Sequence, residues 1–143
     1  MEENYDNEMR IEFVSNAKNE ALARISVASF VASLDPTIEE ISDIKTAVSE
    51  AVTNSIIHGY ENTKGIVTII AKIIHKTIEI EVIDNGRGIE DIEKAKEALY
   101  TTKPELERSG MGFTIMESFM DEMKVKSTVG EGTTVFMKKT IKN

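Results

Sequence analysis

The apolar positions of this chain recur with two different periods, and each period indicates one kind of secondary structure. Alternation with a period of two indicates a strand, whereas recurrence every three or four residues indicates a helix. In the segment 77–83, isoleucine or valine alternates with glutamate, which is typical of a strand with one face in a core and one in water. The predicted strands cover about residues 9–14, 66–74, 77–83, 123–129 and 133–141, and the predicted helices about 17–34, 37–58, 90–99 and 110–120.

The longest predicted helix carries recognisable signals at both ends. Thr37, followed three residues later by Glu40, forms a capping box at its start, and Gly59 follows its last residue. Because an α-helix turns by about 100° per residue, its apolar residues gather on one arc that we expect to face a core. The arc consists of Ile41, Ile44, Val48, Ala51, Val52 and Ser55.

The order of these elements predicts an α+β fold, a two-layer sandwich with helices on one face of a mainly antiparallel mixed sheet. The strands 66–74 and 77–83 are separated by two residues only, which predicts a β-hairpin. A length of 143 residues suits a single domain over residues 1–143. The polar residues 1–8 are expected to be flexible.

Composition and charge narrow the possible functions. The chain has 25 acidic and 17 basic side chains, a net charge of −8, and no block rich in Lys or Arg. Direct binding to nucleic acid is therefore not expected, and a basic protein partner suits the chain better. The absence of cysteine excludes disulfides and thiolate metal sites. Without a signal peptide or an apolar run of membrane-spanning length, the chain is predicted to be cytoplasmic and to have no membrane contact.

Three polar residues of the longest helix, Glu50, Asn54 and His58, are spaced by four and would lie along one edge of its apolar arc. A carboxylate and a carboxamide one turn apart can supply a base and a neutral oxygen ligand for a divalent cation beside a phosphate. A polar helix edge in water has the same pattern and is the commoner use of such a pair. His58 and His75 have no second His nearby in the sequence, so we expect both to be structural.

Asp84 follows a strand that looks buried and precedes Gly86 and Gly88. A carboxylate at such a strand end can accept a hydrogen bond from an exocyclic amine, and glycines allow a planar ring to approach the backbone. A simple Asp-Asn-Gly turn accounts for these residues equally well. Asn85 and Arg87 are assigned no role. The dinucleotide and phosphate-loop glycine motifs do not occur here.

A second glycine pair, Gly110 and Gly112, stands where the polar loop 100–109 enters a predicted helix. Backbone amides at a helix N-terminus can bind phosphate oxygens, and Lys103 and Ser109 could assist them. Glycine that permits close packing at a helix entry is the commoner reason for this pattern.

In order and spacing, these motifs resemble the GHKL family of ATP-binding domains, which includes histidine kinases and type II topoisomerases. The resemblance covers nearly the whole chain and rests on four motifs. They are Glu50-x-x-x-Asn54, Asp84-x-Gly86-x-Gly88, Gly110-Met111-Gly112 and Gly132-Thr133. Within that family, the runs 50–60 and 101–113 are similar to those of the serine kinases that act as anti-sigma factors. The resemblance implies the Bergerat ATP-binding fold.

The resemblance also implies a role for each motif in a kinase that uses Mg-ATP. Asn54 would hold Mg²⁺ against the ATP phosphates, and Glu50 would be the catalytic residue that orients or deprotonates the attacking hydroxyl. Asp84 would bind the adenine amine with support from Thr133. The loop 100–109 would close over the phosphates as a lid. The other residues implied to contact ATP are Gly86, Gly88, Lys103, Ser109, Gly110 and Gly112.

The same resemblance implies protein partners. They are a sporulation sigma factor that is held inactive and an anti-anti-sigma protein that is phosphorylated on a serine, with the chain acting as a homodimer. Arg24 is a candidate partner contact because it is a lone basic residue in its stretch of helix, although a solvated arginine is the ordinary alternative. Two other functions stay open: an ATP-gated sigma-binding module without significant kinase activity, and a nucleotide-free interaction domain whose glycines only form turns.

Overall fold

The computed structural model describes residues 4–61, 63–89 and 107–142. In chain order its elements are β1 (Asn7–Val14), α1 (Asn19–Val31), η1 (Ala32–Leu34), α2 (Ile38–Asn54), η2 (Ser55–Gly59), β2 (Ile66–Ile74), β3 (Thr77–Asp84), α4 (Glu107–Phe119), β4 (Glu122–Thr128) and β5 (Gly132–Thr140). Each strand and helix predicted within these ranges is present. The helix predicted at 90–99 lies outside the described residues.

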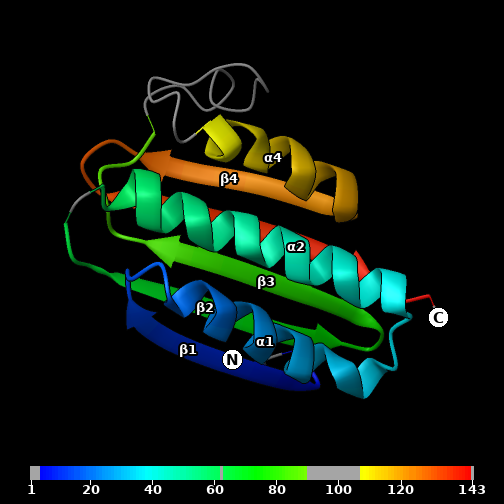
Figure 1. Ribbon diagram of the computed structural model, residues 1–143. Coiled ribbons are helices and arrows are strands. Elements are labelled where there is room, and N and C mark those ends of the chain that lie inside the picture. The colour runs from blue at the N-terminus through cyan, green and yellow to red at the C-terminus, as the bar shows by residue number, and fades with distance from the viewer. Residues whose placement is uncertain (1–3, 62, 90–106, 143) are drawn as a thin grey trace.

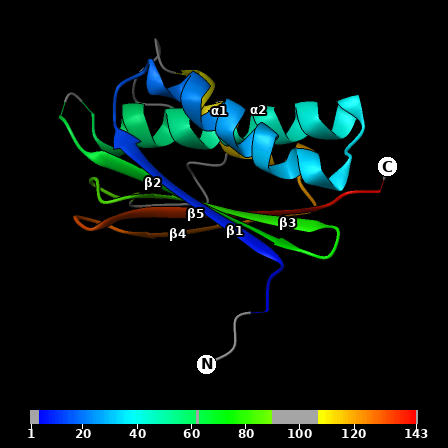
Figure 2. The same ribbon diagram turned by 90° about the horizontal axis from the view of Figure 1, so that it is seen from below.

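Within the described residues, five strands form one sheet in the order β1-β2-β3-β5-β4. Helices α1, α2 and α4 lie side by side on the sheet, with α2 in the middle (Figure 1). The edge-on view shows α1 and α2 on the same side of the sheet (Figure 2). The predicted α+β two-layer sandwich is therefore confirmed.

Every strand pair in the described sheet is antiparallel, so a mixed sheet was the wrong expectation here. The reason is that the hairpins β2-β3 and β4-β5 meet at β3 and β5, which run in opposite directions.

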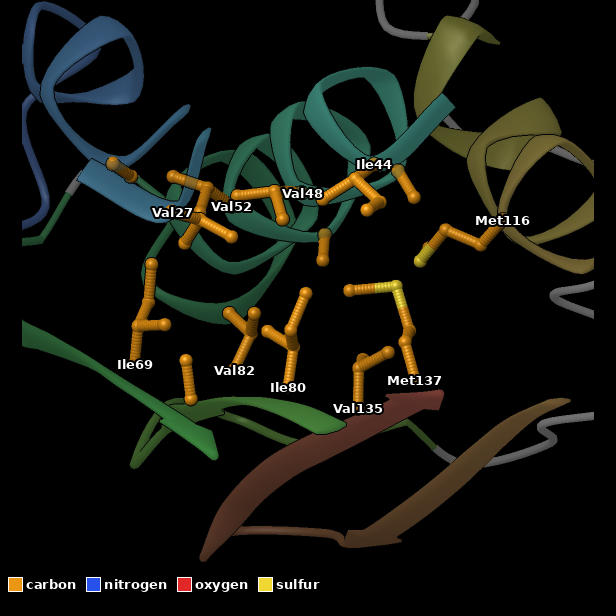
Figure 3. Close-up of a cluster of buried hydrophobic side chains, with 14 of the residues drawn as sticks. Val27, Ile44, Val48, Val52, Ile69, Ile80, Val82, Met116, Val135 and Met137 are labelled. Carbon is orange, nitrogen blue, oxygen red and sulfur yellow. The ribbon is translucent and has the colours of Figure 1, made fainter. Parts of the chain in front are cut away.

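The hydrophobic core lies between the helix layer and the sheet. Figure 3 shows Val48 and Val52 of α2 facing Ile69, Ile80 and Val82 of the central strands, and all five are fully buried. Burial of an aliphatic side chain of this size contributes roughly 1.5–3 kcal/mol relative to its exposure. The core therefore holds α2 against β2 and β3, the two central strands that precede the candidate site.

The predicted capping box at the start of α2 is confirmed. The Glu40 N–H donates to Thr37 Oγ1 at 3.0 Å, and the Thr37 N–H donates to Glu40 Oε1 at 2.9 Å. Two backbone donors that have no partner within the helix are thereby satisfied. Glu40 Oε2 also accepts the Lys142 N–H at 2.7 Å, which ties the end of the chain to the start of α2.

Strand β1 begins earlier than the pattern predicts. Asn7 pairs with Ile73 and Glu8 with Lys72, so the expected flexible segment 1–8 does not extend over its last two residues. Antiparallel pairing uses main-chain groups, and polar side chains on an outer strand do not prevent it. The polar composition of this segment was therefore a poor guide to its order.

Helix α4 also begins earlier than predicted, at Glu107 and not at Gly110. The last residues of the expected loop 100–109 are thus helical, whereas 100–106 lie outside the described residues. Glycine lowers helix propensity by about 1 kcal/mol relative to alanine, which packing of a whole helix can override. Such packing is present, because α4 packs along α2.

Helix α1 has a narrower buried face than its apolar residues suggest. Ala23, Val27 and Val31 are fully buried against the core. Leu22 and Ile25, which also follow the helical spacing, are 53% and 59% exposed. The helix begins two residues later than predicted, at Asn19. One side of α1 therefore presents apolar surface outward.

Candidate functional site

Asp84 is the last residue of β3 and the last member of its inward-facing row. Because Val82 lies in the core, strand alternation places the Asp84 carboxylate on the same buried face, and the residue is only 4% exposed. The Gly86 N–H donates to Asp84 Oδ1 at 3.0 Å. The Ser55 hydroxyl and the Thr133 N–H also donate to this carboxylate. Burial raises the pKa of the Asp84 carboxyl, and these hydrogen bonds offset only part of the rise.

The end of helix η2 approaches Asp84 so closely that only glycine fits. A Cβ on Gly59 would lie 2.9 Å from Asp84 Cγ, and a Cβ on Gly86 would lie 2.0 Å from the Gly59 carbonyl oxygen. Gly88 has a φ of +80°, a backbone conformation that favours glycine. The predicted glycines 86 and 88 are therefore structurally required, and they bring the helix end, the strand end and the turn into contact.

The chain leaves α2 through a π-helical turn, η2, in which the Tyr60 N–H donates to the Ser55 carbonyl at 3.0 Å. This turn is wider than an α-helical turn. His58 lies inside it, so the expected continuation of the α-helical edge from Asn54 to His58 is wrong. Ser55 is buried as predicted, but it also bonds Asp84 and is more than a core residue.

Asn54, the last residue of α2, has a buried carboxamide. Within the described part of the chain, neither Asn54 Oδ1 nor Nδ2 has a hydrogen-bond partner, and both atoms are inaccessible to solvent. A buried polar group without a partner costs about 1–3 kcal/mol, which makes Asn54 a candidate ligand-binding residue. A carboxamide oxygen is a suitable donor for Mg²⁺. Glu50 lies one turn earlier on the same helix and is partly buried.

Thr133 lies opposite Asp84 in the β3-β5 pair. The Thr133 hydroxyl lies 2.7 Å from Ser127 Oγ, and Ser127 Oγ also accepts the Ile89 N–H at 2.7 Å. Ser127 thus connects Thr133 to the backbone that follows the glycine turn. Sequence reasoning missed Ser127, because a serine near the end of an edge strand carries no distinctive signal.

The remaining predicted residues lie apart from this cluster or outside the described side chains. Ser109, Gly110 and Gly112 belong to the first turns of α4, so the expected glycine-led helix entry is replaced by glycines within a helix. Lys103 lies outside the described residues. Arg24 lies on α1, where its Nε bonds Glu20 Oε2 at 3.0 Å.

The matched family model is the histidine kinase-like ATPase domain, which covers residues 13–139. Two similar relatives are anti-sigma F factors. That of Clostridium acetobutylicum is 61% identical, with 94% of each chain covered, and that of Thermoanaerobacter sp. strain X514 is 64% identical, with 96% of each chain covered. The chain belongs to the anti-sigma F factor family of histidine kinase-like ATPase domains. The family assignment from the four motifs is thereby confirmed.

Solved structures share the fold of this anti-sigma F factor family member at low identity. The RsbU and RsbW domains of a Mycobacterium tuberculosis protein match it with a TM-score of 0.68 and 21% identity, over 95% of this chain and 32% of that chain. The catalytic domain of the histidine kinase ThkA matches with a TM-score of 0.58 and 14% identity, over 93% of this chain and 98% of that chain. At such low sequence identities, the likeness establishes only a shared fold.

Among the described residues, no helix is both long and apolar enough to cross a membrane.

Proposed function

We propose that this protein is an ATP-dependent anti-sigma factor that binds and inhibits a sporulation sigma factor and phosphorylates a serine of its anti-anti-sigma antagonist. The family assignment supports the anti-sigma role, since its relatives carry that name. The observation that carries the ATP-dependent part is the Asn54 carboxamide, which is buried without a partner one turn after Glu50. The protein would act as a protein serine/threonine kinase and as a single ATP-binding domain over residues 1–143.

The adenine-binding end of the proposed site consists of Asp84 and the groups around it. Its carboxylate accepts three hydrogen bonds from the protein, and two carboxylate oxygens offer about four acceptor positions. One position is thus left for the adenine amine, with Thr133 in support. Gly86 and Gly88 would shape the adenine pocket, because glycine at these positions lets the turn pack against Gly59 and Thr128 beside Asp84.

The phosphate end is the edge of α2. Asn54 would hold Mg²⁺ through its carboxamide oxygen, and the ion would supply positive charge against the ATP phosphates. The other proposed phosphate contacts are Lys103, which precedes α4, and Ser109, Gly110 and Gly112, which lie in the first turns of α4. We propose that residues 100–109 act as the lid.

Glu50 has the role of orienting the serine hydroxyl of the antagonist or accepting its proton. As that oxygen forms its bond to the γ-phosphorus, the bond between the γ-phosphorus and the ADP oxygen breaks, and ADP leaves with the electron pair. The proton passes to the Glu50 carboxylate. A carboxylate is a common general base, and α2 holds this one a single turn from the metal-binding carboxamide.

The partner surface is proposed on helix α1. Leu22 and Ile25 expose apolar side chains there, and Arg24 lies between them in sequence with its side chain about one-third exposed. Exposed apolar residues beside an arginine are typical of protein interfaces. We propose that this protein acts in the cytoplasm as a homodimer, that Arg24 contacts a protein partner, and that neither nucleic acid nor membrane is bound directly.

The deciding experiment measures transfer of the γ-phosphate from Mg-ATP to a purified anti-anti-sigma protein, with Glu50→Gln beside the wild type. We expect transfer by the wild type and a loss of several orders of magnitude in Glu50→Gln, with unchanged ATP affinity. Absence of transfer from a wild type that binds ATP would favour the ATP-gated sigma-binding module. Absence of ATP binding altogether would leave the nucleotide-free interaction domain.

A further inference from the structure

Three contacts join the end of helix η2 to the turn that follows β3. The Asn85 N–H donates to the Tyr60 hydroxyl at 2.8 Å, and the Arg87 N–H donates to the Gly59 carbonyl at 2.8 Å. On the outside, Arg87 Nη1 bonds Glu61 Oε1 at 2.8 Å. We call residues 59–61 and 85–87 together the turn clamp. The sequence pattern assigned no role to Asn85 or Arg87.

Tyr60 is the buried member of the turn clamp. Its hydroxyl accepts the Asn85 N–H and donates to the Ile66 carbonyl, so both functions of the hydroxyl are used. The ring is held from another side, because a Cβ on Gly65 would lie 2.2 Å from a ring carbon. Tyr60 is only 8% exposed. A tyrosine fixed in this way can define the position of a backbone amide.

We propose that Tyr60 is a positioning residue for the nucleotide, which holds the turn 84–88 in the conformation that binds the adenine base. The proposal rests on the proposed function, in which Asp84 receives the base. Asn85 lies between Asp84 and Gly86, and the Gly86 N–H is itself a donor to Asp84 Oδ1. Movement of the Asn85 amide would therefore move the donor that orients the Asp84 carboxylate.

The turn clamp also sets the distance between the two ends of the proposed site. Tyr60 directly follows η2, and η2 directly follows Asn54 at the end of α2. The hydroxyl of Tyr60 thus connects the helix that carries the metal-binding residue to the turn that carries Asp84. Such a connection keeps the site organised before a ligand binds, which reduces the ordering cost of binding.

The test measures the dissociation constants of ATP with Mg²⁺, ADP with Mg²⁺ and adenosine alone for the wild type and Tyr60→Phe. Phenylalanine keeps the ring and removes the hydroxyl, which leaves the Asn85 N–H without its acceptor. Loss of such a bond predicts about a tenfold rise in the dissociation constant. The same factor is expected for all three ligands, because all three contain adenine. Tyr5→Phe is the matched control, because its hydroxyl bonds exposed Glu8 and its removal is expected to change no constant.

The outcomes separate this inference from the proposed function. If the wild type binds none of the ligands, the proposed function fails and the inference with it. If the wild type binds them and a folded Tyr60→Phe binds them equally well, only the inference fails, because Tyr60 then stabilises the fold alone. Should Tyr60→Phe not fold, Arg87→Gln removes the half-exposed outer bond of the same turn clamp. We expect Arg87→Gln to raise the dissociation constants of all three ligands about two- to threefold. Unchanged dissociation constants would overturn the inference.

Discussion

Replacement of Asn54 by leucine should stabilise the protein while it abolishes binding of Mg-ATP. The Asn54 carboxamide is buried without a partner among the described residues, and such a group costs about 1–3 kcal/mol. Leucine has a similar shape and no polar atoms, so we expect Asn54→Leu to raise the free energy of unfolding by about 2 kcal/mol. For a domain of this size, that gain corresponds to a rise in Tm of roughly 5–8 °C.

The assay is chemical and thermal unfolding without nucleotide and with saturating Mg-ATP. Ser42→Leu, at an exposed position of the same helix, is the control for the higher helix propensity of leucine, and its effect should stay within about 0.5 kcal/mol. A ligand at 100 times its dissociation constant stabilises by about 2.7 kcal/mol, and Asn54→Leu should lose that increment. A nucleotide-free Asn54→Leu protein less stable than the wild type would refute the reasoning, because the carboxamide would then be satisfied in the absence of ligand.

Two further predictions concern Asp84 and the start of α2. Because burial raises the pKa of Asp84 in the folded state above its ordinary value, the folded state binds more protons than the unfolded state between the two values. The free energy of unfolding should therefore fall as pH rises through that window. Asp84→Asn should remove this dependence, which unfolding of both proteins across acidic pH would measure, and parallel pH profiles would contradict it. Thr37→Ala should lower the free energy of unfolding by about 1 kcal/mol in denaturant titrations, since the capping box is lost. Its affinity for ATP should not change, because Thr37 is at the opposite end of α2 from Asn54, and a changed affinity would argue against a purely structural cap.

Much of the fold could be predicted because its signals are local. The capping box needs only Thr37 and Glu40, and the alternation that ends at Asp84 needs only the residues of one strand. The strand was predicted to end before Asp84, whereas β3 includes it, so the inward position of Asp84 was not predicted. The boundaries at Asn7 and Glu107 could not be predicted in this way, because they depend on pairing with β2 and on packing against α2.

The candidate site was predicted only in part for a related reason. Asp84 and Asn54 carry functional groups that are unusual in a core, so they stand out in the sequence. Ser55 and Ser127 do not, although each bonds a residue of the site. Their contacts join segments distant in sequence, and the register that brings Ser127 opposite Thr133 belongs to the β4-β5 pair.

The kinds of elements, their order and the residues with unusual chemistry can be inferred from the amino-acid order alone, because spacing, capping and charge act between near neighbours in the chain. Three features depend on the folded arrangement: Gly59 lies against Asp84, Tyr60 holds the Asn85 amide, and the Asn54 carboxamide has no partner among the described residues. Those features depend on the relative positions of a π-helical turn, a strand end and a helix end. Packing of the whole core sets these positions, and no local sequence pattern encodes them.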